Sequence, residues 1–90
     1  MTAEMLTFPK KPQRSVKAAC GAAMREAREL AGLDLYEAAQ RINLTLGTTV
    51  IGVGMLQGWE DGIHRAPAEA LIAAVRLAGD DAVRIIASLL

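Results

Sequence analysis

The stretch L-Q-G-W-E-D-G-I-H-R-A-P, residues 56–67, marks the end of one helix and the beginning of another. Gly62 stands where a glycine commonly ends a helix, and Pro67 stands where a proline commonly begins one. His64 and Arg65 lie between them. The stretch therefore predicts a helix that ends just before Gly62, a short basic turn, and a further helix from Pro67.

Two more helices are expected before this stretch. Ser15 is a suitable N-cap residue, and apolar residues recur at three- and four-residue steps over 16–31, with Gly32 at the end. Asp34 and Glu37 form the acidic version of a capping box. They predict a second helix that ends at residue 42 or 43.

The chain after Pro67 predicts a fourth and a fifth helix. Apolar residues give a broad face over 67–78, and Gly79 interrupts the pattern. Asp80 or Asp81 should cap a last helix with an apolar stripe that reaches the C-terminus. Such a helix on a small domain either completes the core or forms a homodimer interface. The candidate interface residues are Ile85, Ile86, Leu89 and Leu90.

The segment over 43–55 is the hardest to assign. Gly47, Gly52 and Gly54 weaken a helix, whereas residues 48–53 have a composition typical of a β-strand. We expect an irregular, partly apolar connection, with the third helix beginning between residues 49 and 54. A short strand and a dimer-forming segment are the alternatives.

Composition favours an all-α fold. Apolar residues make up 52% of the 90-residue chain and aromatic residues only 3%. Alanine, leucine, methionine, arginine and glutamate, all good helix formers, dominate. The length suits one small core. We expect a compact five-helix domain over 15–90.

The residues that could carry chemistry are few. Cys20 is the only cysteine, so it cannot form an intramolecular disulfide and is expected to be a buried thiol. With one histidine, no zinc site is expected. We predict a non-enzymatic protein with no catalytic residue, metal or cofactor. No apolar span or signal peptide is evident, so we expect a cytoplasmic protein without a membrane partner.

Charge is unevenly distributed although the formal net charge is zero. Residues 1–20 carry four basic side chains and one acidic one, whereas residues 21–90 carry six arginines and nine acids. Residues 1–14 contain two prolines and a K-K-P-Q-R cluster, and we expect a flexible basic arm. Its Lys10, Lys11 and Arg14 either contact nucleic-acid phosphates or belong to a solvated tail.

These pieces, in this order, resemble the phage-repressor and Cro-like helix-turn-helix family over about residues 24–90. The resemblance rests on three segments: R-E-A-R-E-L-A-G-L-D-L-Y-E-A-A (25–39), the opening stretch (56–67), and A-L-I-A-A-V-R-L-A-G (70–79). It implies a transcriptional regulator that binds double-stranded DNA as a homodimer through its third helix. It also implies a structural ion pair between Arg28 and Glu60, with Trp59 beside it in the core.

The chain departs from the family's pattern in two places. Thirteen residues separate Ile42 from Leu56, more than a tight helix-turn-helix allows, although some actinobacterial regulators carry a similar extension. The residue after the cap of the second helix is often a glutamine that anchors a phosphate, and here it is Leu35. Of the residues at the start of the third helix, only Gln57 is of a base-reading type, with adenine as its natural target.

The remaining candidate DNA contacts are polar or basic. Thr45, Thr48, Thr49 and Arg65 are suited to phosphates, which position a protein without reading sequence. For several of them a structural role is an alternative: Thr48 and Thr49 as caps of the third helix, His64-Arg65 as an ordinary turn, and Arg41 as a partner of Glu37. With the arm, the predicted DNA-binding set is Lys10, Lys11, Arg14, Arg41, Thr45, Thr48, Thr49, Gln57, His64 and Arg65.

A second functional hypothesis is a protein-binding adaptor or antitoxin-like partner on the same fold with reduced base readout. Its motivation is the apolar, glycine-rich segment over 44–56 and the acidic body of the domain. Burial of that segment in the core of a single chain would weaken this hypothesis.

Overall fold

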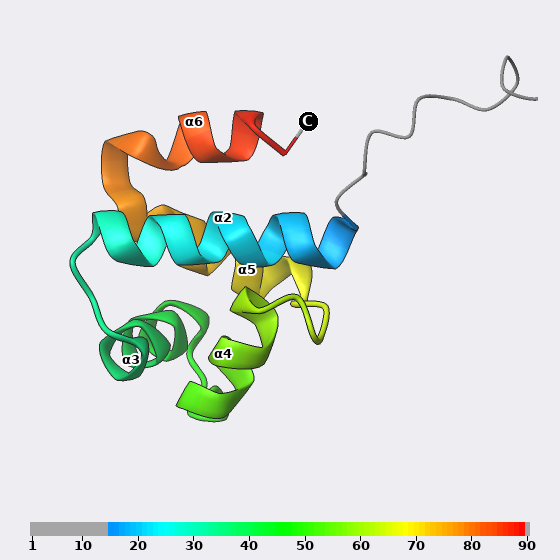
Figure 1. The fold of residues 1–90 in the computed structure, drawn as a ribbon. Coiled ribbons are helices and arrows are strands. Elements are labelled where there is room, and N and C mark those ends of the chain that lie inside the picture. Colours follow the sequence, from blue (N-terminus) through cyan, green and yellow to red (C-terminus); the bar gives the residue numbers. More distant parts are fainter. Residues whose placement is uncertain (1–14, 90) are drawn as a thin grey trace, which may run out of the picture.

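The computed structural model describes residues 15–89, and they form an all-helical unit (Figure 1). Its elements are α2 (Val16–Leu30), α3 (Leu35–Leu46), α4 (Val53–Glu60), α5 (Ala68–Val75), the 3-10 helix η1 (Arg76–Asp81) and α6 (Ala82–Ala87). Within 15–89 there is no β-strand, so the strand considered for 43–55 does not form. The predicted arm over 1–14 and Leu90 lie outside the described residues.

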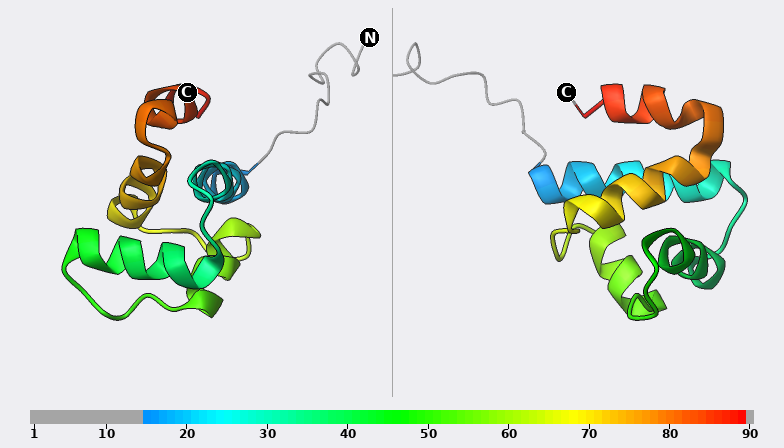
Figure 2. Two further views of the ribbon diagram at one scale, coloured as in Figure 1. Left: turned by 90° about the vertical axis from the view of Figure 1, so that its left-hand side faces the viewer. Right: turned by 180° about the vertical axis from the view of Figure 1, so that it is seen from behind.

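α2 is the central element. It contacts α4, α5 and α6, and α3 in turn contacts α4 and α5. α6 lies on one side of α2, whereas α3 and α4 lie on the other (Figure 1). The turned views show α5 beside α2, between these two sides (Figure 2). One face of the molecule is therefore built by α3, α4 and the connection between them.

The predicted caps of α2 and α3 are confirmed. The Ser15 hydroxyl accepts a hydrogen bond from the Ala18 N–H at 3.1 Å. The Asp34 carboxylate accepts one from the Glu37 N–H at 2.8 Å, while the Glu37 carboxylate accepts one from the Asp34 N–H at 3.0 Å. Both sets satisfy backbone donors that have no partner inside the helix.

α3 is longer than predicted, because it ends at Leu46 and not at residue 42 or 43. Gly47 ends it in the left-handed conformation, at φ 70° and ψ 34°, and its N–H donates to the Asn43 carbonyl. The connection to α4 is therefore only residues 47–52. Most of the apparent enlargement between Ile42 and Leu56 is extra helix.

The C-terminal part also differs from the prediction. The helix expected over 67–78 tightens into η1 from Arg76, and Gly79, at φ 62° and ψ −121°, breaks the helical path. Asp81 precedes α6 but makes no side-chain cap hydrogen bond, because its own backbone is still helical. α6 then ends at Ala87, short of the expected C-terminus.

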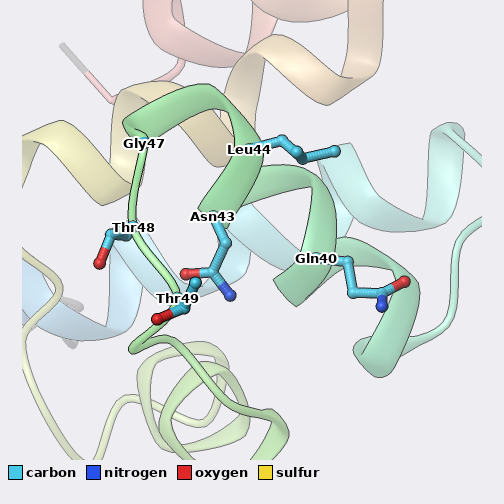
Figure 3. Close-up of a pocket in the computed structure, with 6 residues that line it drawn as sticks. All are labelled: Gln40, Asn43, Leu44, Gly47, Thr48 and Thr49. Carbon is cyan, nitrogen blue, oxygen red and sulfur yellow. The ribbon is translucent and has the colours of Figure 1, made fainter.

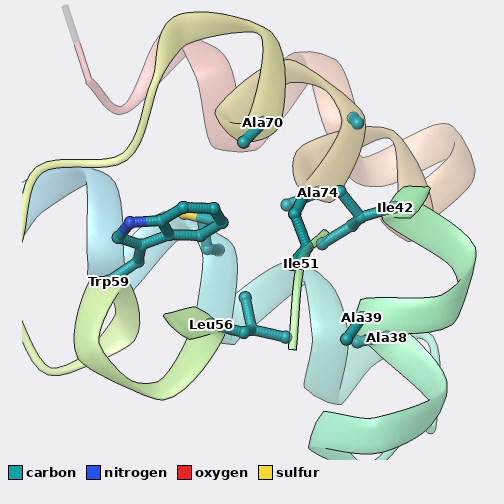
Figure 4. Close-up of a cluster of buried hydrophobic side chains, with 10 residues drawn as sticks. Ala38, Ala39, Ile42, Ile51, Leu56, Trp59, Ala70 and Ala74 are labelled. Atoms are coloured by element: carbon teal, nitrogen blue, oxygen red, sulfur yellow. The ribbon is translucent and has the colours of Figure 1, made fainter. Parts of the chain in front are cut away.

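The core is built largely from small side chains and a few large ones (Figure 4). Trp59 is 6% exposed, as predicted for a core residue, and Leu56 and Ile42 are almost fully buried. The main cluster also contains Met24, Ala38, Ala39, Ile51, Ala70, Ala73 and Ala74. A second cluster, Ala23, Ala27, Val75 and Ile85, joins α2 to α5 and α6.

Gly21 sets how closely α2 and α4 approach each other. A Cβ atom on Gly21 would lie 2.1 Å from the Trp59 carbonyl oxygen and 2.8 Å from that of Glu60. Both distances are below any real Cβ contact, and both neighbours are backbone atoms. The C-terminal turn of α4 therefore lies directly against the backbone of α2.

Candidate nucleic-acid interface

The connection between α3 and α4 is held by one side chain. The Asn43 amide donates to the Ile51 carbonyl at 2.8 Å, and its oxygen accepts from the Ile51 N–H at 3.1 Å. Asn43 thereby pairs with Ile51 as a neighbouring strand would, and Ile51 is buried in the core. This two-point contact fixes the path of residues 47–52 and so the position at which α4 begins.

A buried carboxylate joins α4 to α2. Glu60, whose side chain is 2% exposed, accepts hydrogen bonds from Arg28 Nε at 2.8 Å and Nη2 at 3.0 Å. Arg28 Nη1 also donates to the Leu33 carbonyl, and Arg25 donates to Glu60 at 3.3 Å and to Asp61. The predicted Arg28–Glu60 pair is therefore present, within a network of two arginines and two acids.

This network is structural, because its charges are paired. Hydrogen bonding to Glu60 raises the pKa of the Arg28 guanidinium above its ordinary value, so Arg28 stays charged wherever the protein is folded. Burial opposes that rise, but its effect is the smaller one. The bidentate geometry fixes the rotation of α4 about its axis and thus decides which of its side chains face outward.

The outward side of α4 carries few polar side chains. Val53, Gly54 and Gln57 are exposed, whereas Leu56 and Trp59 are buried. Gly58 is covered by the His64 ring, because a Cβ there would lie 3.0 Å from His64 Cδ2. Gln57, the one residue of α4 that the sequence predicts to read bases, is on the surface.

Arg41 and Thr45 do not join Gln57. On α3 they lie one turn apart, and the Thr45 hydroxyl donates to the Arg41 carbonyl at 3.0 Å. At about 100° per residue they point to the side of α3 opposite Asn43, which faces the connection to α4. Thr45 instead lines a shallow depression beside α5 with Glu69, Ile72 and Arg76. No Arg41–Glu37 ion pair forms among residues 15–89.

Thr48 and Thr49 lie on the connection itself, next to Asn43 (Figure 3). They line a shallow surface depression with Gln40, Leu44 and Gly47. Neither threonine caps α4, whose N-cap residue is Gly52 and receives no side-chain hydrogen bond. The Thr48 hydroxyl accepts from the Val50 N–H at 3.4 Å, within the connection. The Thr48 and Thr49 hydroxyls therefore lie at the edge of the surface formed by α3, the connection and the start of α4.

A basic cluster, Lys17, His64 and Arg65, lies at the other end of α4. Lys17 Nζ donates to the Ile63 carbonyl at 3.4 Å, which places the first turn of α2 beside the turn that follows α4. His64 and Arg65 are exposed. Lys17 was not among the predicted contacts, since sequence alone gives no sign that residues 46 positions apart meet. Lys10, Lys11 and Arg14 lie outside the described residues.

The N-terminus of α3 is unsuited to a phosphate. The carboxylates of Glu37 and Asp34 accept hydrogen bonds from two of its free backbone N–H groups, those of Asp34 and Glu37. Negative side chains there repel a second anion. Leu35, the first residue of α3, packs against the core. Phosphate contacts on this face would have to come from the connection over 47–52 and from the basic cluster.

Exposed apolar side chains accompany the polar ones. Leu44 is 79% exposed, Val50 70%, Met55 44% and Val53 38%. Leu46 and Ile51, from the same segment, pack in or against the core. The segment over 44–56 is therefore divided between the core and the surface.

The predicted dimer residues are divided in the same way. Ile85 is completely buried against α2 and α5, so it is unavailable to a partner. Leu89 packs partly against the same cluster. Ile86 is 42% exposed, and Val83, which was not predicted, is 77% exposed. The outward apolar side of α6 is therefore formed by Val83 and Ile86.

Other kinds of site are not evident in the part of the chain that the structure describes. Between residues 15 and 89, no three His, Cys, Asp or Glu side chains are grouped as metal ligands would be. No helix there has the length and apolar character needed to cross a membrane. No family model matches the chain, and no curated protein or solved structure is significantly similar to it.

Proposed function

We propose that the protein is a small repressor-like helix-turn-helix regulator that binds double-stranded DNA. The observation that carries the proposal is the α3–α4 unit. A six-residue connection clamped by Asn43 presents the outward side of α4, while the Arg28–Glu60 pair holds its inner side on α2. A helix presented in this way is what a major groove accommodates.

The charge distribution supports DNA as the partner. Lys17, His64 and Arg65 flank the C-terminal end of α4, and the arm that precedes α2 adds Lys10, Lys11 and Arg14. The acids at the C-terminal end of α4, Glu60 and Asp61, are paired with Arg25 and Arg28. A chain with zero net charge can therefore present a positive edge to phosphates.

The test is a band-shift titration on genomic fragments over a range of salt concentrations. Affinity should fall with salt, because each phosphate contact contributes about 0.9 to the slope of log K against log salt. Lys17→Ala and Arg65→Ala should each lower the slope by about that amount. Arg76→Ala, an exposed arginine beside α5, is the matched control. Absence of binding at low salt would refute the proposal.

A homodimer is part of the proposal, because two-fold symmetric proteins read the two halves of a palindromic site. The exposed apolar side of α6, Val83 and Ile86, is the proposed contact. Ile86→Ser should shift the protein towards monomer in sedimentation equilibrium and weaken DNA binding. A monomeric wild-type protein at concentrations that saturate DNA would exclude this arrangement.

A protein-binding adaptor on the same fold is the second candidate, favoured by the exposure of Leu44, Val50 and Met55. It is weakened because Ile51 and Leu56, from the same segment, are buried in the core. Under this hypothesis Val50→Ser with Met55→Ser should abolish a stoichiometric protein complex. Gln57→Ala, and the combined replacement of Lys10, Lys11 and Arg14 by alanine, should then leave DNA affinity unchanged.

A further inference from the structure

Gly54 is not required by the fold. It lies in the first turn of α4, its backbone is helical, and a Cβ atom there would meet nothing within 4 Å. Glycine destabilises a helix relative to alanine, because it has more conformational freedom to lose. Gly21 shows the opposite case, in which a neighbouring backbone excludes any side chain. The bare backbone at Gly54 is therefore open to a partner that comes from outside the molecule.

Val53 and Gln57 border this bare patch. They are four residues apart on α4, which makes their side chains neighbours on one side of the helix. Val53 is 38% exposed and Gln57 is exposed. Together they offer one apolar side chain and one amide beside a backbone that can be approached closely.

We propose that this patch reads adjacent A·T base pairs, with Gln57 on an adenine, Val53 on a thymine methyl group, and Gly54 allowing the close approach. The inference rests on the proposed DNA-binding function and assigns the base class that the site recognises. Gln57 can donate to adenine N7 and accept from N6–H, while a methyl group in the major groove belongs to thymine alone. Val53 and Gln57 are four residues and therefore about 6 Å apart along α4, which is less than two base-pair rises of about 3.4 Å, so their side chains can reach neighbouring pairs.

G·C pairs lack a reader on this side of α4. Guanine is read by an arginine or lysine fork and cytosine by a carboxylate, and α4 carries no basic residue. Asp61, one turn beyond Gln57, is engaged by Arg25. Glu60 is buried in its pair with Arg28. Arg41 lies on the side of α3 opposite Asn43 and therefore away from α4.

Selection of full-length protein on a randomised duplex library is the primary test. The wild type should enrich sites with adjacent A·T pairs. Gln57→Ala should lower the discrimination at one adenine by between about 5-fold and about 150-fold. Gln57→Arg should move the preference at that position to guanine, which no merely structural role of Gln57 would produce. Gln40→Ala, an exposed glutamine on α3, should leave base preference unchanged.

Replacement of thymine by uracil in the selected duplex removes only the methyl group. Affinity should fall by about fourfold for the wild type and be unaffected for Val53→Ala. Ile72→Ala, which truncates an exposed apolar side chain on α5, should retain the wild-type sensitivity to uracil. Gly54→Ala should fold with an unchanged or higher urea midpoint and yet bind the selected duplex more weakly.

The outcomes separate the inference from the function on which it rests. Salt-dependent binding with a G·C preference, or with a preference that Gln57→Ala leaves unaltered, would overturn the inference and leave DNA binding intact. If Gly54→Ala binds the selected duplex with unchanged affinity, the α4 backbone does not approach the DNA closely at Gly54. If the protein enriches no sequence from the library and binds no DNA at low salt, both the A·T readout and the DNA-binding function are overturned.

Discussion

Gly21→Ala is the substitution that most directly tests the packing of α4 on α2. The added Cβ would lie 2.1 Å from the Trp59 carbonyl oxygen. A carbon and a carbonyl oxygen normally approach to about 3.3 Å. The two helices would therefore have to separate by about 1 Å. That movement would loosen the contact of Trp59 with the core and the Arg28–Glu60 pair.

The magnitude follows from two opposing effects. Overpacking of a well-packed contact costs about 1–3 kcal/mol, and the upper end applies here because the clash is with backbone, which cannot rotate away. Alanine in place of glycine stabilises α2 by about 1 kcal/mol. We expect a net loss of about 2 kcal/mol. For a domain of this size the melting temperature should fall by roughly 8–16 °C.

The assay is urea unfolding followed by the fluorescence of Trp59, the single tryptophan, which is buried in the native state. The midpoint should fall while the slope stays unchanged. Gly54→Ala is the matched control: it is also a helical glycine, but its Cβ would meet open space. A Gly21→Ala protein as stable as the wild type would show that α2 and α4 do not approach as described.

The remaining predictions concern the links that position α4. Glu60→Gln should destabilise the protein by about 3 kcal/mol in the same urea assay, because Arg28 loses a buried charged partner. Arg84→Ala, which breaks an exposed pair with Glu26, should lower the urea midpoint much less. If Glu60→Gln and Arg84→Ala lower the stability equally, burial does not strengthen the Arg28–Glu60 pair. Asn43→Ala should cost about 1–3 kcal/mol and selectively increase hydrogen exchange at the Ile51 amide. Slow hydrogen exchange at the Ile51 amide in Asn43→Ala would show that the Asn43 side chain does not hold Ile51 in place. Asp34→Ala should cost about 1 kcal/mol by thermal melting, whereas Asp34→Asn should cost clearly less, since an asparagine oxygen still accepts from the Glu37 N–H.

Features that depend on neighbours in the chain were predicted well. The Ser15 cap, the Asp34–Glu37 capping box and the burial of Trp59 are confirmed, because helix starts are encoded by residues a few positions apart. The end of α3 was predicted too early. Asn43 has low helix propensity, yet its side chain finds partners on Ile51 and α3 continues past it to Gly47.

The candidate site was predicted only in part. Gln57 and Arg65 are exposed on α4 and the turn that follows it. Arg41 and Thr45 lie on the side of α3 opposite Asn43, and Thr45 lies beside α5. Lys17 was missed as a site residue, since only the packing of α2 on the turn brings it there. Ile85, a candidate for the dimer interface, is in the core.

The sequence by itself determined the all-helical character, the starts of α2 and α3, and the punctuation of 56–67 by Gly62 and Pro67. These depend on short-range backbone hydrogen bonding and conformational preference, which neighbouring residues decide. Only the tertiary structure decided which side of α4 faces outward. That depends on Gly21 allowing a close approach, on Glu60 meeting Arg28, and on Asn43 holding Ile51, contacts between segments that local sequence does not relate.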